Sequence, residues 1–319
     1  MQTPTSSERI RGAVYGLAAV SIWAAFIVVA RLGLRSSLTP WDIAALRFAV
    51  SGSLLLPYVL RKGFALERLG WIGLAAIVIG CGVPMVLLAN AGLVFAPAAH
   101  AGALFPGVMP LMVAILAAAI LKEPFTLRKR IGLILIVVGG VGIVWGADGT
   151  LGTEQNIGHM LFLAAGLAWA CYTVAMRRAR LDGLHAAAIA AVVSAALYLP
   201  AYAYLARTRI LQAPPSDLAL QAIVQGFLTG IVALLLYGRM VAILGASGGA
   251  AFVALTPAMT ALMAVPILGE WPSLTDCMAI ALISIGVYIV NGGPLPAPAT
   301  WTTLVRMQSF GPAKTAEKP

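Results

Sequence analysis

The sequence predicts an all-α integral membrane protein with ten transmembrane helices, arranged as two inverted five-helix repeats. Three observations support this fold class. The 319 residues are 61% hydrophobic and only 10% charged, whereas soluble domains carry about 25% charged residues. Ten separate apolar runs have the length and composition of helices that cross a bilayer. Finally, two stretches of the chain that lie 147 positions apart repeat one another.

The ten apolar runs define the expected helices in order. The first run is much longer than the core of a signal peptide, which is about 7 to 15 residues, so it is expected to be a membrane helix. The fifth run is the shortest. In chain order the expected spans are Ile10–Ala30, Trp41–Leu60, Leu69–Val94, Ala98–Leu121, Ile131–Trp145, Ile157–Met176, Leu184–Leu205, Leu218–Ile243, Gly249–Leu268 and Leu274–Val290.

The expected domain organisation follows from these runs. Residues 1–9 form a cytoplasmic N-terminal segment, residues 10–147 the first five-helix repeat and residues 157–292 the second, inverted repeat. Residues 293–319 are rich in proline and polar residues and end in "GPAKTAEKP". Such a composition cannot bury enough apolar surface to fold, so we expect a disordered cytoplasmic tail.

The net charge of +10 is explained by membrane orientation. With a cytoplasmic N-terminus, 16 of the 21 basic residues fall on cytoplasmic segments and only four on outer ones, while Arg47 lies inside the second span. Basic residues favour the cytoplasmic side of membrane proteins. The charge therefore requires no nucleic-acid partner, and both termini are expected in the cytoplasm, with lipid as the surroundings of the spans.

The internal repeat is strongest between "PLMVAILAAAILKEP" at Pro110–Pro124 and "PAMTALMAVPILGEW" at Pro257–Trp271. At an offset of 147, eleven of the 25 positions from Ala99 to Glu123 are identical. A second match, at an offset of 146, aligns "AAVSIWAAFIVVAR" with "AAGLAWACYTVAMR". Because each half has an odd number of spans, the second copy must enter the membrane from the opposite side. Inverted repeats of this kind are typical of alternating-access transporters.

These motifs carry a family resemblance. Each half has a Trp in its first helix and a Pro…Leu-x-Glu segment that closes its fourth, which resembles the EamA-type drug/metabolite transporter superfamily over about residues 10 to 292. The resemblance implies an inner-membrane exporter of small metabolites such as amino acids, or of drug-like compounds. The second half departs from the first in lacking a counterpart of Arg47, because its span 184–205 has no Asp, Glu, Lys or Arg.

Candidate substrate-binding residues lie inside the spans. Trp23 and Trp169 each precede an Arg by eight residues, which places each about 12 Å inside its face; they either line a cavity or pack helices. Arg47 lies in a span, where a charge marks a pathway by default; it either contacts a substrate carboxylate or snorkels to the interface. The full set of expected substrate-binding residues is Trp23, Arg47, Asn90, His100, Phe105, Trp169, Tyr172, Tyr237 and Phe252.

Asn90, Tyr237 and His100 in this set each have a second interpretation. Asn90 and Tyr237 are aligned by the 147-residue offset; they either bind a ligand or join helices by hydrogen bonds. His100 begins the fourth span, where it either senses pH or touches substrate, or is a solvated interfacial side chain. Small-residue patterns such as Gly12-x-x-x-Gly16 suit internal packing and dimers alike, so the sequence leaves the oligomeric state open.

The repeated segments also supply candidate hinges and gates. Pro110 and Pro257, with Pro106 and Pro266, are expected to kink the fourth and ninth spans, because proline removes a helix hydrogen bond. Such kinks serve as hinges or as fixed bends. Glu123 and Glu270 either anchor latches at two gates or mark helix ends at the interface.

Other functions find little support. Three scattered cysteines and three histidines, with no Cys-x-x-Cys and no histidine cluster, predict no metal or cofactor. A membrane-embedded enzyme would need a nucleophile, base and orienting group within reach, and a channel or structural membrane protein is the third alternative. All eleven acidic residues lie in loops or near span ends. We therefore expect facilitated or weakly coupled export, with proton coupling only through a peripheral group such as His100 or Asp42.

Overall fold

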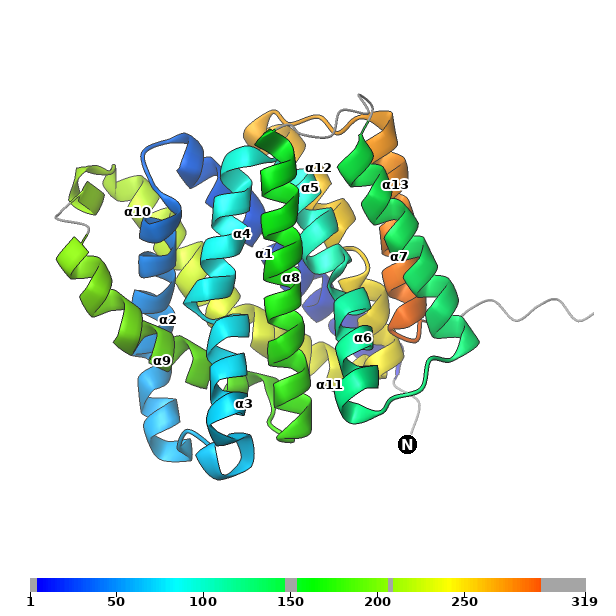
Figure 1. Ribbon diagram of the computed structural model, residues 1–319, viewed down its shortest axis with the longest axis horizontal. Helices are drawn as coiled ribbons and strands as arrows, with labels where there is room; N and C mark the ends of the chain where they lie inside the picture. Colours follow the sequence, from blue (N-terminus) through cyan, green and yellow to red (C-terminus); the bar gives the residue numbers. More distant parts are fainter. Residues whose placement is uncertain (1–4, 147–153, 206–208, 294–319) are drawn as a thin grey trace, which may run out of the picture.

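Every element in the described part of the chain is a helix (Figure 1). The computed structural model describes residues 5–146, 154–205 and 209–293. Residues 1–4 of the predicted N-terminal segment and residues 294–319 of the predicted tail lie outside the described residues. The all-α prediction is confirmed for the described ranges.

The first half contains five helical segments, of which two are interrupted. Helix α1 begins with a capping box between Thr5 and Glu8, and α2 with one between Thr39 and Asp42, so two backbone donors at each start are satisfied by side chains. The bounds are α1 Ser6–Arg35, α2 Pro40–Lys62, α3 Leu66–Cys81, α4 Val83–Phe95, α5 Ala98–Gly102, the π-helix η1 Ala103–Gly107, α6 Met109–Leu121 and α7 Leu127–Trp145.

The second half repeats this order with its own interruptions. The bounds are α8 Glu154–Arg178, α9 Gly183–Leu205, the 3₁₀ helix η2 Arg209–Gln212, α10 Pro215–Gln221, the π-helix η3 Ala222–Val232, α11 Ala233–Val253, α12 Thr256–Leu268 and α13 Leu274–Val290. Inside α11, Gly245 adopts φ 74° and ψ 174°, a left-handed extended conformation that glycine tolerates, and it divides two membrane segments. The sequence predicts this division between spans eight and nine.

Eight helical segments in the described residues are long and apolar enough to cross a membrane. They coincide with predicted spans one to four and six to nine. The other two predicted spans are helical but fall short of that standard. Helix α7 carries Arg128, Lys129 and Arg130 in its first turn, and α13 is only 17 residues long. The count of ten crossings therefore stays a prediction.

The breaks expected in the fourth and ninth spans are present at aligned places. The chain leaves the regular helix at Val108 before α6 and at Leu255 before α12, two positions related by the 147-residue offset. Pro110 and Pro257 lie in the first turns of α6 and α12. A proline there removes no helical hydrogen bond, so these two residues start new helices after a break and do not bend continuous ones.

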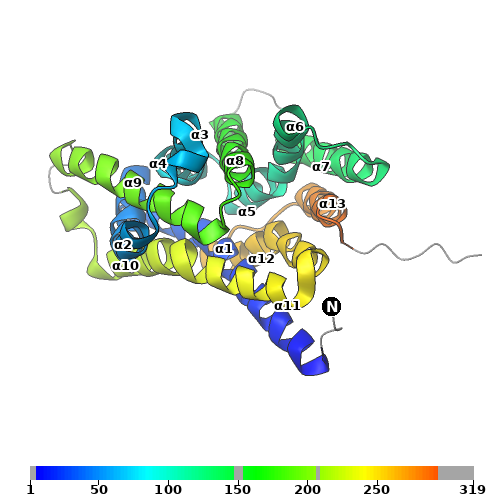
Figure 2. The same cartoon turned by 90° about the horizontal axis from the view of Figure 1, so that it is seen from below.

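The two halves interlock through matching helix pairs. Helix α7 packs against α13 and α2 against α9, at opposite sides of the molecule in both views (Figures 1 and 2). Helix α1 packs against α11 and α12 of the other half, and α8 packs against α3, α4 and α6 in the same way. Each first helix of a repeat is thus surrounded by helices of the opposite repeat.

Small residues allow the closest of these approaches. A Cβ added at Gly139 would lie 2.7 Å from the backbone oxygen of Ala279, and one at Gly286 would lie 2.6 Å from that of Gly132. Gly139 and Gly286 are aligned by the 147-residue offset, so the α7–α13 contact is built the same way from both sides. Gly12 and Gly16 face the α11 side chains Leu244 and Met240. The Gly12-x-x-x-Gly16 pattern is therefore used inside the monomer.

Candidate functional site

One ion-pair group joins the two halves around Glu270, in the connection between α12 and α13. The Glu270 Oε1 atom accepts from Arg31 Nε at 3.0 Å and from Arg35 Nη2 at 2.5 Å. Its Oε2 atom accepts from the backbone N–H of Ala98 at 2.8 Å. Arg31 also donates to the carbonyl of Leu93 at the end of α4. We call Arg31, Arg35, Ala98 and Glu270 the Glu270 group.

A second ion-pair group joins the halves around Glu123, in the connection between α6 and α7. The carboxylate of Glu123 accepts from Arg177, near the end of α8, and its Oε2 lies 3.5 Å from Lys129 Nζ. We call Arg177, Lys129 and Glu123 the Glu123 group. The connection that holds Glu123 and the one that holds Glu270 lie at opposite ends of the bundle (Figure 1).

The two groups are equivalent in the internal repeat. Arg31 and Arg177 are aligned at the 146-residue offset, and Glu123 and Glu270 at 147. The local backbone matches as well. The N–H of Glu123 donates to Ala117 O and the N–H of Glu270 to Ala264 O, both at 3.4 Å. The residue before each glutamate, Lys122 or Gly269, is left-handed. The same local arrangement therefore occurs at each end.

The two groups differ in strength. Glu270 is 11% exposed and accepts from three donors, whereas Glu123 is 28% exposed and accepts from two side chains, the exposed Arg177 and the partly exposed Lys129. Arg35 has no basic counterpart in the second half, because the aligned position is Leu181. Exposed ion pairs contribute little because solvent screens them. The Glu270 end is therefore held more firmly than the Glu123 end.

The predicted aromatic residues form two groups. Trp23 contacts Tyr237 with ring centroids 5.3 Å apart and ring planes tilted by 48°. Trp169 contacts Tyr172 at 5.3 Å and Phe105 at 6.4 Å. Within the described ranges, no ring contact joins the two groups.

Phe252 and Tyr172, two of the predicted substrate-binding residues, make further contacts. Phe252 packs over Gly16 of α1, on the side of Trp23. The Tyr172 hydroxyl donates to the carbonyl of Gly183 at 3.3 Å, which already occupies its polar group.

Arg47 is buried without a counter-charge. Its side chain is only 7% exposed, its guanidinium lies 5.0 Å from the centroid of Phe26 and 5.8 Å from that of Phe48, and Nη1 has no hydrogen-bond partner among the described residues. The aromatic faces supply partial compensation. Snorkelling would place the guanidinium in water, and this geometry does not. A buried cation of this kind favours an anionic ligand.

Three buried amide side chains lie in α4, α10 and η3, and sequence reasoning missed two of them. Gln221 and Gln225 donate to the carbonyls of Val29 and Phe26 in α1, at 2.6 and 2.9 Å, and their Oε1 atoms are unpaired among the described residues. Neither amide atom of the fully buried Asn90 has a partner there. The signal in the sequence was two glutamines one helical turn apart in an apolar run.

His100 does not lie at a solvated interface, contrary to one of its two expected interpretations. It is buried, with Nδ1 at 2.9 Å from His159 Nε2 and Nε2 at 3.2 Å from Asp276 Oδ1. Gln155 Nε2 lies 3.5 Å from His100 Nδ1. Three helices thus bring together two histidines and an aspartate that are distant in the sequence. No cluster of three metal-ligand residues able to hold a metal ion occurs among the described residues.

The acidic residues near span ends are also less peripheral than their positions indicate. Asp42 starts α2 but is buried; it accepts from Thr39 and from the Tyr202 hydroxyl of α9. Asp276 starts α13 yet reaches His100. A position at a helix end thus does not expose a carboxylate when a neighbouring helix covers it.

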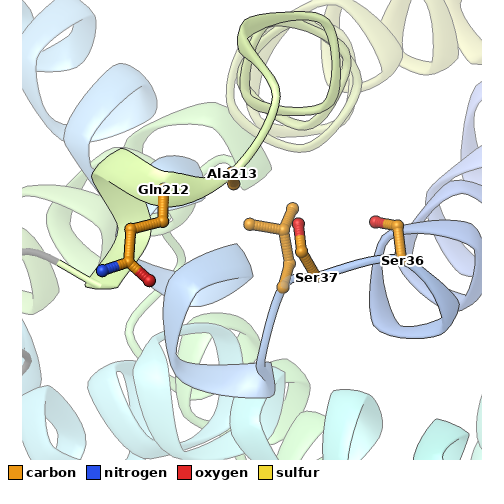
Figure 3. Close-up of a pocket in the computed structure, with 5 residues that line it drawn as sticks. Ser36, Ser37, Gln212 and Ala213 are labelled. Carbon is orange, nitrogen blue, oxygen red and sulfur yellow. The ribbon is translucent and has the colours of Figure 1, made fainter.

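A hollow of about 480 Å³ lies where the α1–α2 connection meets the segment before α10. It is lined by Ser36, Ser37, Leu38, Gln212 and Ala213, and Figure 3 shows the polar side chains of Ser36, Ser37 and Gln212 on its two sides. None of the predicted substrate-binding residues lines this hollow. It is a feature of one end of the bundle, separate from Trp23, Arg47 and Trp169.

Comparison with known proteins identifies the family of the chain. The model of the EamA-like transporter family matches twice, over residues 10–145 and 156–292. The chain belongs to the EamA-like transporter family. It is 24% identical over 197 residues to a Bacillus subtilis (strain 168) protein named "Uncharacterized transporter YyaM". That alignment covers 60% of this chain and 64% of the relative, so it spans under two thirds of the relative's length.

The fold of this EamA-like protein also resembles a solved crystal structure. The TM-score is 0.57 at 23% identity, over 93% of this chain and 98% of the other. The family and the eight apolar helices make the protein a multi-pass membrane protein of the EamA-like transporter family. The family resemblance stated from the sequence is thereby confirmed.

Proposed function

We propose that this EamA-like protein exports small metabolites, either amino acids or amphipathic drug-like compounds, across the bacterial inner membrane by alternating access. The two repeats are inverted, ten helices cross the membrane, and both termini are cytoplasmic. The observation that carries this proposal is the pair of equivalent ion-pair groups at opposite ends of the bundle. Each group ties the first helix of one repeat to the fourth helical segment of the other.

The mechanism follows from how each group would break. Separation of Arg31 and Arg35 from Glu270 opens the Glu270 end, while Arg177 and Glu123 keep the other end shut. The reverse separation opens the Glu123 end. Since both groups are built from the same repeated segment, the two openings are equivalent motions of the two repeats, as in other inverted-repeat carriers.

The substrate class follows from the buried groups between the ends. Arg47 supplies an uncompensated cation, and Phe26 and Phe48 supply aromatic faces. A substrate with a carboxylate and an apolar body would pair with the guanidinium and cover these rings, which offsets the cost of a buried charge. Trp23 and Trp169 would contact its apolar part, from α1 and α8.

Sidedness provides the direct test of the inverted arrangement. Lys122 and Trp271 are exposed and adjacent to Glu123 and Glu270. In a background without the three native cysteines, Lys122→Cys and Trp271→Cys are treated on intact cells with a membrane-impermeant maleimide. We expect the Trp271→Cys variant to react from outside and the Lys122→Cys variant only after permeabilisation. Reaction of both variants from the same side overturns the proposal.

A resistance screen identifies the substrate. Cells that overproduce the protein are grown against toxic amino acids and cationic dyes, and the screen is repeated with Arg47→Ala, Trp169→Ala and the exposed control Arg61→Ala. We expect resistance to one compound class, lost with Arg47→Ala and kept with Arg61→Ala. The transport rate of the identified compound is then measured against its concentration. A rate that rises linearly, without saturation, would instead indicate a channel.

A further inference from the structure

Two buried histidines and a partly buried aspartate form a continuous hydrogen-bonded chain at the Glu270 end of the bundle. His159 of α8 contacts His100 of α5, and His100 contacts Asp276 of α13. The two imidazole centroids are 5.1 Å apart. His159 is 3% exposed, and its Nδ1 has no hydrogen-bond partner among the described residues. We call His100, His159 and Asp276 the histidine chain.

We propose that the histidine chain is a proton-binding site with a capacity of one proton, and that the bound proton holds the Glu270 end closed. The first part stands on the geometry alone. The second part rests on the proposed alternating-access function, because it assigns the proton a role in one of the two gates.

The hydrogen bonds define the proton-free form. Asp276 Oδ2 accepts from the N–H and hydroxyl of Ser273, and Oδ1 is left to accept from His100. His100 then donates from Nε2, and its Nδ1 accepts from His159 Nε2–H. Both imidazoles are neutral in this arrangement. The Nδ1 atom of His159 remains as a basic nitrogen without a donor, which is the site where a further proton can add.

One proton can be added without breaking any contact. It bonds to His159 Nδ1, the Nε2–H bond of His159 breaks, and that proton forms an N–H bond with His100 Nδ1. His159 stays neutral, and His100 becomes an imidazolium that donates to His159 and to the Asp276 carboxylate. Both of its hydrogen bonds are now charge-assisted and therefore stronger.

A second proton cannot be accommodated. Each nitrogen of the 2.9 Å contact between His100 Nδ1 and His159 Nε2 would then carry hydrogen. Two donors cannot share a contact of that length, so the rings would have to separate. Gln155 does not change this count, because its amide can turn either its oxygen or its nitrogen toward His100 Nδ1.

Few other charges face the site. Helices α4 and α12 and the π-helix η1, which pack against α5, contain no titratable residue. From α1, Arg31 and Arg35 are held by Glu270, which lies just beyond α12. Helix α8 adds the exposed Glu154. Helix α13 adds Cys277 beside Asp276, and Tyr288 far along the helix. The Asp276 carboxylate is therefore the anion that directly contacts the histidines.

Helix α5 connects the histidine chain to the Glu270 group. The N–H of Ala98 donates to Glu270 Oε2, and His100 follows two residues later on the same short helix. The histidine chain ties this helix of the first repeat to α8 and α13 of the second. Opening of the Glu270 end moves these elements apart, so stronger bonds within the chain favour closure. Closure in turn favours proton binding by the same factor.

Nitrogen NMR of the imidazole rings tests the capacity of the site and requires no transport. The protein is labelled with ¹⁵N-histidine and placed in lipid nanodiscs. The His185→Gln substitution removes the only other histidine, which contacts Gly63 O. Between pH 8 and pH 5 we expect one imidazolium for the two rings together, and loss of this uptake in the Asp276→Asn variant. Two imidazolium rings, or none, overturn the proposed site.

Thiol accessibility tests the role of the proton in the gate. Leu93 is buried, and its carbonyl accepts from Arg31. In the cysteine-free background, the rate at which maleimide labels Leu93→Cys is measured at each pH. It is compared with the rate for the same variant carrying His159→Gln. Because both variants have the same thiol, this ratio cancels the effect of thiol ionisation. We expect proton binding to slow labelling about fivefold relative to His159→Gln, a factor that corresponds to about 1 kcal/mol.

The controls separate this result from misfolding. His185→Gln should keep the pH response, and Asp276→Asn should remove it as His159→Gln does. Glu270→Gln raises the rate at every pH and shows that the reporter senses the gate. A rate ratio that does not change with pH, or a pH response that survives both His159→Gln and Asp276→Asn, overturns the gating role.

Discussion

Replacement of Glu270 by Gln should open one end of the protein and leave the other shut. The substitution keeps the size of the side chain but removes the charge that Arg31 and Arg35 contact at 3.0 and 2.5 Å. The Arg31 contact is mostly buried, so its change from an ion pair to a hydrogen bond between arginine and an uncharged amide costs about 1.5 kcal/mol. Arg35 is 41% exposed, and its contact adds only about 0.5 kcal/mol.

The total of about 2 kcal/mol corresponds to a roughly 30-fold shift toward the open form of the Glu270 end. The matched substitution, Glu123→Gln, removes contacts whose partners are exposed, so the expected cost is about 0.5 kcal/mol, or about twofold. The prediction is therefore an unequal effect from two chemically identical substitutions at equivalent positions.

Maleimide labelling of Leu93→Cys measures the opening, with each glutamine substitution in turn. Glu270→Gln should raise the labelling rate about 30-fold. Glu123→Gln should leave it unchanged or lower it, because opening at one end excludes opening at the other. Equal acceleration by both substitutions would refute the reasoning, since it would indicate general loosening of the bundle and not two alternating gates. Thermal unfolding of both variants provides the control for such loosening.

The remaining predictions concern stability and binding. Arg47→Met should raise the unfolding temperature by a few degrees, because it removes an uncompensated buried charge, and should abolish transport of the screened substrate; a lower unfolding temperature contradicts the burial argument. Gly286→Ala should destabilise the protein by about 2 kcal/mol through the clash with Gly132 O, whereas Gly238→Ala, with open space around its Cβ position, should be neutral in the same thermal assay. Thr126→Ala should cost about 1 kcal/mol, because its hydroxyl caps the N-terminus of α7; an unchanged unfolding temperature would show that water replaces the cap.

The fold was largely predictable because lipid imposes a strong constraint on sequence. Each crossing segment must be a long apolar helix, so the helical ranges could be read directly from hydropathy. Even the division within α11 was predictable, since Ser247, Gly248 and Gly249 interrupt the apolar run beside Gly245. The break at Gly82 between α3 and α4 was not predicted, because the flanking residues form one apolar run.

The candidate site was less predictable because its chemistry depends on contacts between distant helices. Along the chain, His100 is 59 positions from His159 and 176 positions from Asp276. No local sequence pattern links these residues. The burial of Asp42 likewise depends on Tyr202 of α9. By contrast, Glu123 and Glu270 were identifiable as equivalent because the repeat aligned them, although their arginine partners emerged only from the tertiary structure.

The unequal strength of the Glu270 and Glu123 groups affects which conformation the proposed transporter adopts when no substrate is bound. In the proposed orientation the Glu270 end faces the cell exterior, so a transporter with its stronger ion-pair group at that end would spend most of its time with its interior open to the cytoplasm. A compound produced in the cell then meets a receptive carrier without first forcing a rearrangement, so little of its binding free energy is lost to conformational selection. A compound arriving from outside must find the rare molecule that faces it. Removal of Arg35, which has no basic counterpart in the second repeat, would reduce this bias by only about 0.5 kcal/mol, because the more buried contact between Arg31 and Glu270 would remain.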